Sequence, residues 1–121
     1  MPHIRASIDG VPYSKAKTRG NKAAAEAWSQ RVIQQTRSLS PVSDACVLRV
    51  TFRLPRDKFP PDFPYGPDLD NLLKRLLDAL GHTVFAASRG GDSCVVALEA
   101  MKVPVDTQPG VDIEILPVRV A

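Results

Sequence analysis

Two aspartates, Asp68 and Asp70, stand one residue apart in the segment GPDLDNLLKRLLDAL (66–80), and Lys74 follows one helical turn after Asp70. Carboxylates at this spacing can hold a hard divalent cation such as Mg²⁺ or Mn²⁺, which relieves their mutual repulsion. Such a cation can polarise a phosphoryl group and lower the pKa of a bound water, and a lysine can stabilise the charge that develops in the transition state. These residue types therefore fit hydrolysis of a phosphodiester.

The same residues also have a purely structural interpretation. Asp68 is a good N-cap and Asp70 a good first-turn acid, because carboxylates accept bonds from the unpaired N–H groups at a helix start. Lys74 would then only form an i,i+4 ion pair with Asp70, which contributes about 0.2–0.5 kcal/mol. Capping needs one acid, however, and a third, Asp92, directly precedes a segment expected to form a strand. A sheet could bring Asp92 back against the helix start, so both interpretations stay open.

Charge is distributed unevenly along the chain, although the net charge is only +3. Residues 1–58 carry 11 Lys and Arg against 4 Asp and Glu, whereas residues 59–121 carry 5 against 9. This asymmetry indicates a basic surface that attracts a polyanion and a separate acidic site. Six basic residues are candidates for phosphate contacts: Lys15, Lys17, Arg19, Arg53, Arg56 and Lys58.

The length of 121 residues fits one compact domain, so we expect a single domain over residues 1–121. No apolar segment is long enough to span a bilayer, and the segment MPHIRASIDG carries charges where a signal peptide would be apolar. We therefore expect a soluble, intracellular protein. Cys46 and Cys94 lie in apolar segments, which suits a reducing compartment, and two cysteines make neither a zinc site nor a disulfide framework.

The spacing of apolar residues predicts a mixed α+β fold. Four segments are expected to form strands: 3–8, 45–55, 93–103 and 111–120. Two segments are expected to form helices: 22–39 and 69–80. In the second helix, six leucines follow the i, i+3, i+4, i+7 rule. The order strand, helix, strand, helix, strand, strand predicts a single-domain mixed sheet of about four strands with two helices.

The segments PDLDNLLKRLLDAL, GDSCVVAL and MKV resemble the signature of the RusA-like Holliday junction resolvases, a family of crossover junction endodeoxyribonucleases. The family pattern is roughly D-x-D-N-x-x-K-x-x-x-D-A-L, then a loop with D-D-x-Q-V-V, then a strand that ends in K. The resemblance implies a role for each matching residue. The metal-binding catalytic carboxylates would be Asp68, Asp70 and Asp92, the catalytic lysine Lys74, and the supporting residues Asn71 and Asp78.

The resemblance also implies how such a protein works. Family members are small homodimers that require Mg²⁺ or Mn²⁺ and cut four-way DNA junctions symmetrically, often encoded by phages. For this chain it implies a metal-dependent endodeoxyribonuclease that acts on Holliday junctions or branched DNA in recombination and repair. The six basic residues would contact the DNA, in the cytoplasm of a bacterium or of a phage-infected host cell.

The chain departs from the family pattern in the loop before the third predicted strand. Gly91 stands where the family has the first of two acids, and Cys94 stands where glutamine is usual. One alternative is therefore a catalytically weakened or inactive DNA-binding module of the same fold. Another is a structural protein whose acids cap a helix and whose basic half binds an acidic partner. Divalent metal separates the three hypotheses, because only the nuclease needs it to cut DNA.

Overall fold

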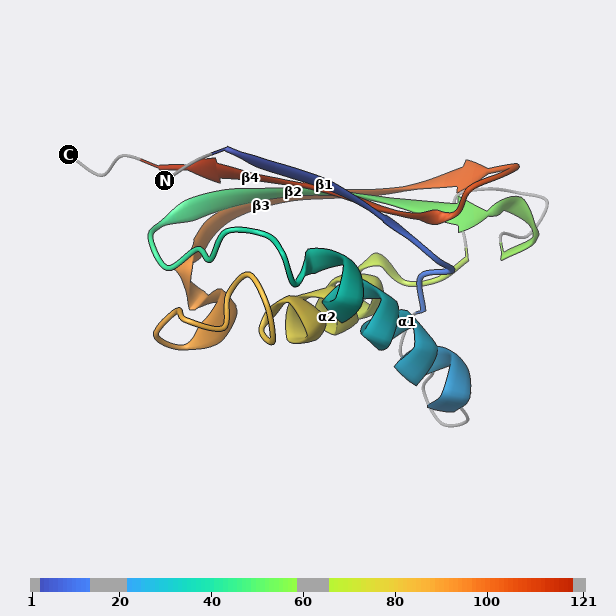
Figure 1. The fold of residues 1–121 in the computed structure, drawn as a ribbon. Coiled ribbons are helices and arrows are strands. Elements are labelled where there is room, and N and C mark those ends of the chain that lie inside the picture. The colour runs from blue at the N-terminus through green and yellow to red at the C-terminus, as the bar shows by residue number, and fades with distance from the viewer. Residues whose placement is uncertain (1–2, 14–21, 59–65, 119–121) are drawn as a thin grey trace.

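The computed structural model describes residues 3–13, 22–58 and 66–118. Its elements, in chain order, are β1 (Ile4–Asp9), α1 (Lys22–Thr36), β2 (Cys46–Pro55), the 3-10 helix η1 (Arg56–Lys58), α2 (Leu69–Leu80), the 3-10 helix η2 (Gly91–Cys94), β3 (Val95–Val105) and β4 (Gly110–Pro117). Within the described residues these elements form one four-stranded mixed sheet and two α-helices, which confirms the predicted α+β fold (Figure 1). No helix in the described ranges is long and apolar enough to cross a membrane.

The strand order in the sheet is β1-β4-β2-β3. β4 pairs antiparallel with both β1 and β2, whereas β2 and β3 are parallel. A parallel pair needs a crossover connection, and here α2 provides it. β3 therefore lies at one edge of the sheet, and no other described strand pairs with its outer side.

The core lies between one face of the sheet and the two helices (Figure 1). Alternate residues of β2 from Cys46 to Leu54 are buried, because successive side chains of a strand point to opposite faces. The leucine stripe of α2 buries Leu72 and Leu76 against them, and α1 contributes Trp28. The polar side of α2 is thereby left facing solvent.

α2 runs antiparallel to β3, and two contacts at its start and end establish this direction. The ammonium of Lys102, late in β3, donates to the carbonyl of Pro67 at 2.7 Å, so the helix start lies beside the later part of that strand. After the helix, the carbonyl of Val84 accepts from the backbone N–H of Val42, shortly before β2 begins, at 2.8 Å. The first residues of β2 and β3 are opposite one another, so the beginning of β3 lies near the C-terminal end of α2 (Figure 1).

The predicted boundaries differ from the structure by up to three residues, and two of these differences have local causes. α1 ends at Thr36 instead of continuing to 39, and the Thr36 hydroxyl bonds the carbonyl of Val32 and the hydroxyl of Thr83, each at 2.7 Å. β3 begins at Val95 instead of 93, because the preceding residues form η2.

Candidate active site

Asp68 occupies the N-cap position of α2 but does not cap the helix. Its backbone is extended, with φ −67° and ψ 130°, and its side chain makes no capping hydrogen bond. Its Oδ2 instead accepts a long bond of 3.4 Å from the Asn71 amide. A capping side chain normally bonds the N–H of N2 or N3. Asp68 is exposed, so its carboxylate is available to a ligand.

Asp70 and Lys74 lie on the same exposed side of α2, one turn apart. No ion pair joins them among the described residues, so the structural role considered for Lys74 from the sequence is not observed. Asp78 is also exposed, but it lies eight residues after Asp70, which is about 12 Å along a helix axis. Asp68 and Asp70 therefore place two exposed carboxylates at the helix start, and neither forms an ion pair among the described residues.

Asp92 lies elsewhere, in η2 directly before β3. Lys102 lies seven positions after Val95 along the extended strand, a span of about 23 Å. Because Lys102 contacts the residue before Asp68, Asp92 lies toward the other end of α2. In the ranges that the structure describes, no three His, Cys, Asp or Glu side chains are close enough together to hold a metal ion. The expected return of Asp92 to the helix start is therefore not seen within one chain.

The turn that carries Asp92 is shaped by two glycines and packed by two thiols. Gly90 and Gly91 have φ of 90° and 62°, backbone conformations that most side chains avoid. The Cys46 thiol lies 3.8 Å from the carbonyl of Cys94, and burial, followed by the neighbouring Cys94, raises the pKa of Cys46 to about 11. A thiol with this pKa stays protonated at neutral pH, which is consistent with a packing role for Cys46.

Lys102 is a site residue that the sequence-based search for acids and basic clusters did not assign. Its position in β3 is opposite the buried Phe52, on the face that meets the helices, and it is half-buried. Lysine seldom occupies such a position unless it has a partner, and the Pro67 carbonyl is one. A charge-assisted bond of this kind is stronger than a neutral one, so Lys102 fixes the helix start to the sheet. Two signals for Lys102 were available in the sequence: its inward-facing position in the strand, and the lysine that ends the strand in the family pattern.

The basic residues are divided between several places. Lys15, Lys17 and Arg19 lie outside the described residues. Arg56 begins η1 and is exposed, with an ion pair to Asp106 at 2.7 Å, and Lys58 is the last residue of η1.

Arg53 lies on the sheet face opposite α2, and only 17 % of its side chain is exposed. It donates to the Gln108 carbonyl and to the Ser7 hydroxyl at 3.1 Å, and it pairs with Asp112 at 3.3 Å. Its charge is neutralised within the sheet by Asp112. We therefore infer a structural role for Arg53, in which its side chain links β2 to β1 and β4.

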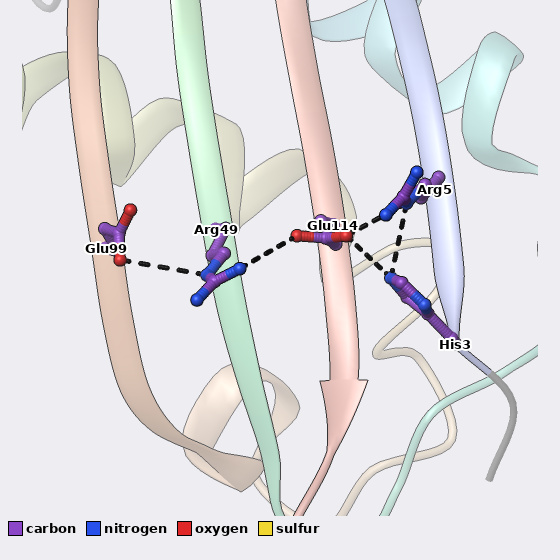
Figure 2. A network of polar contacts seen from close by, with 5 residues as sticks. All are labelled: His3, Arg5, Arg49, Glu99 and Glu114. Atoms are coloured by element: carbon purple, nitrogen blue, oxygen red, sulfur yellow. Dashed lines mark hydrogen bonds and ion pairs between the residues drawn. The ribbon is translucent and has the colours of Figure 1, made fainter.

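The open face of the sheet carries a row of alternating charges (Figure 2). Glu114 accepts from His3 at 2.7 Å, from Arg5 at 2.9 Å and from Arg49 at 3.5 Å, and Arg49 also pairs with Glu99 at 3.7 Å. The hydrogen bond from His3, reinforced by Arg5, lowers the pKa of Glu114. Since the charges of Arg5 and Arg49 are balanced by those of Glu99 and Glu114, these arginines offer no surplus positive charge to a polyanion. The candidate site is the opposite side, at the start of α2.

A sequence model of one protein family, described as Endodeoxyribonuclease RusA, matches residues 11–116 of the chain. The match covers both α-helices, η2, β2 and β3, and nearly all of β4. No curated protein gives a significant match. The family match extends the likeness beyond the helix motif to the first half of the chain, where the motifs are least specific.

Proposed function

The chain belongs to the RusA family of endodeoxyribonucleases, and from this premise we propose that it resolves Holliday junctions by metal-dependent hydrolysis. The reaction would be a pair of phosphodiester cuts in four-way or branched DNA during recombination and repair. It would take place in the cytoplasm of a bacterium or of a phage-infected cell.

The observation that carries the proposal is that the exposed carboxylate of Asp68 does not cap α2. An aspartate at an N-cap position stabilises a helix by bonding its N–H groups, yet this side chain makes no such bond. A departure from local helix chemistry is expected where a residue serves a function instead. The neighbouring Asp70 makes no ion pair with Lys74, so a second hard oxygen donor is exposed in the first turn of the same helix.

These donors suit Mg²⁺ or Mn²⁺, which prefer carboxylate oxygens. Asp68 and Asp70 would hold the ion, and the bond from Asn71 would orient the Asp68 carboxylate. When bound, the ion would polarise the phosphoryl group and acidify the attacking water. Lys74 would place its ammonium against the charge that develops on the phosphoryl oxygens.

The DNA would be held by basic residues outside the balanced open face of the sheet. In this proposal the phosphate contacts come from Lys15, Lys17, Arg19, Arg56 and Lys58. A two-fold homodimer would present two sites to opposite strands, which makes the cuts paired. Because phosphate contacts release counterions, junction binding should weaken steeply as salt is raised.

The test is cleavage of a labelled four-way junction, with linear duplex of the same arm sequences as the reference substrate. We expect symmetric cuts in the junction with Mg²⁺ or Mn²⁺ and none with a chelator. Asp70→Asn should reduce cleavage by at least about 100-fold while junction binding persists, because an amide is a poor ligand for these ions. Asp44→Asn, an exposed site before β2, is the matched control. Equal cleavage by wild type and Asp70→Asn would contradict the proposal.

A second candidate is a module of the same fold that binds junctions without cutting them. Gly91, which replaces an acid of the family pattern, favours it. Metal-independent junction binding without cleavage in the same assay would identify this function.

A further inference from the structure

We propose that Arg75, held against the ring of Tyr13, binds a backbone phosphate of the DNA, and that Tyr13 positions its guanidinium for this contact. The inference rests on the proposed action on junction DNA. It adds to that proposal a phosphate site on α2, the helix that carries the candidate metal ligands.

Arg75 lies over the ring of Tyr13. Its guanidinium carbon is 5.4 Å from the centre of the ring, which is within the range of a cation–π interaction. Both residues are half-buried, and Tyr13 packs against the hydrophobic core. The ring therefore restricts the arginine side chain, which reduces the conformational entropy that this side chain loses when it binds a ligand.

The charge of Arg75 is not neutralised by a carboxylate within the ranges that the structure describes. Four arginines of the sheet and η1 each pair with an acid: Arg5, Arg49, Arg53 and Arg56. Three others without such a pair are exposed to solvent: Arg31, Arg37 and Arg89. Among the described arginines, Arg75 thus combines partial burial with an unpaired charge, which leaves its guanidinium available to an external anion.

The Nε–H of Arg75 is buried and has no hydrogen-bond partner among the described residues. A buried donor without a partner destabilises a fold, so stability alone does not favour an arginine at this position. Departures of this kind are expected where a residue serves a function. The amino groups of a guanidinium form a planar fork that matches the oxygens of a phosphate, so a phosphate is the ligand that best accounts for this arginine.

Arg75 also lies close to the residues that the proposed function uses. It follows Lys74 directly and comes five residues after Asp70, which is about 7.5 Å along the helix axis. Each DNA strand has a phosphate about every 3.4 Å of its axis, so a strand that passes Asp70 has further phosphates near this part of α2. Tyr13 precedes Lys15 by two residues. The pair therefore connects the helix of the candidate metal ligands to the segment that leads to three of the candidate DNA contacts.

The experiment measures the salt dependence of junction binding in the presence of a chelator, so that no cleavage occurs. Arg75→Met removes the charge but keeps an unbranched apolar side chain that can pack on the Tyr13 ring. Each phosphate contact contributes about −0.9 to the slope of log affinity against log salt. We expect the slope to become less steep by about 0.9 for each Arg75 that contacts the DNA. At 0.1 M salt the Kd should rise about eightfold per contact.

Arg5→Ala is the matched control. It removes one guanidinium from the open face of the sheet, where Arg5 is paired with Glu114 (Figure 2), and it should leave the slope unchanged. Junctions with two different arm sequences should lose affinity equally in Arg75→Met, because a phosphate contact carries no sequence information. A loss that depends on the arm sequence would indicate a base contact and would overturn the phosphate assignment.

Two substitutions of Tyr13 test its positioning role. Tyr13→Leu removes the ring, so the Kd should rise about two- to fivefold while the slope stays that of the wild type, because the arginine is still present. Tyr13→Phe keeps the ring and should retain the wild-type affinity. Equal affinity of Tyr13→Leu and the wild type would show that Tyr13 does not position Arg75.

Thermal unfolding without DNA checks that weaker binding is not loss of the fold. Arg75→Met should unfold at the wild-type temperature or above it, because it loses a buried donor without a partner. If this variant does not fold, Arg75→Gln, which also removes the charge, takes its place with the same expected slope. An unchanged slope in a folded neutral variant would overturn the phosphate site. If the wild type binds the junction but does not cut it, the nuclease proposal fails while the slopes still decide the phosphate site, so the two failures are distinguishable.

Discussion

Replacement of Asp68 separates the structural and the chemical role of this residue. Loss of a capping aspartate costs about 0.5–2 kcal/mol of stability. Asp68 makes no capping bond, so what it contributes is its attraction to the positive helix end, about 0.3–1 kcal/mol, offset by repulsion from Asp70. We therefore expect Asp68→Asn to change the free energy of unfolding by less than about 0.5 kcal/mol.

Asp68→Ser provides the complementary change. Its hydroxyl can accept the bond that the aspartate leaves unmade, so we expect a gain of about 0.5–1 kcal/mol, or a few degrees in Tm. Both variants remove a metal ligand, so junction cleavage should fall by at least about 100-fold in each. Stability and activity would then change in opposite directions in Asp68→Ser, as is common where a functional residue replaces a better structural one.

The measurements are guanidinium unfolding followed by circular dichroism and cleavage of labelled junction at saturating Mg²⁺. Asp44→Asn controls for the loss of one exposed carboxylate elsewhere. If Asp68→Asn lost about 1 kcal/mol or more and retained cleavage, the carboxylate would be a cap after all. The metal assignment at the helix start would then be refuted.

Two further predictions concern the glycine turn and the charged row. Gly91→Ala should cost about 1–2 kcal/mol in chemical unfolding, because its φ is 62° although no atom lies within 4 Å of the added Cβ. Gly90→Ala should cost more, since its Cβ would also lie 2.7 Å from the Ser93 hydroxyl; equal losses would contradict this. The lowered pKa of Glu114 means that its stabilising contribution is present above the unfolded-state value, about 4.3, and is lost as pH falls through the folded value. The stability difference between wild type and Glu114→Gln should therefore shrink from about pH 6 to pH 3 in unfolding titrations, and a constant difference would refute the role of the bond from His3.

The fold was largely predictable because each element carries its own periodic pattern. The bounds of α2 agree with the predicted 69–80, since the leucine stripe ends where Gly81 begins the next turn. The start of β3 was less predictable. The apolar pattern cannot reveal that Gly90 and Gly91 adopt positive φ and bend the chain into a 3-10 turn.

The site was predictable only where it is local. Asp68 is the N-cap of α2 and Asp70 and Lys74 lie in its first turns, so the sequence alone places all three residues near the start of the helix. The position of Asp92 depends on which end of β3 meets the start of α2, and that direction is set by the crossover and the strand pairing. No spacing along the chain encodes it.

The hydrogen bond from the Lys102 ammonium to the Pro67 carbonyl restricts the amino acid at position 102 but not the one at position 67. Every amino acid has a main-chain carbonyl, so the residue at position 67 can be substituted without loss of this hydrogen bond. Position 102 has no such freedom, because it needs a long side chain that ends in a donor. A design that grafts the α2 motif onto another scaffold must therefore include a lysine at the position equivalent to Lys102. The residue equivalent to Pro67 can be chosen freely.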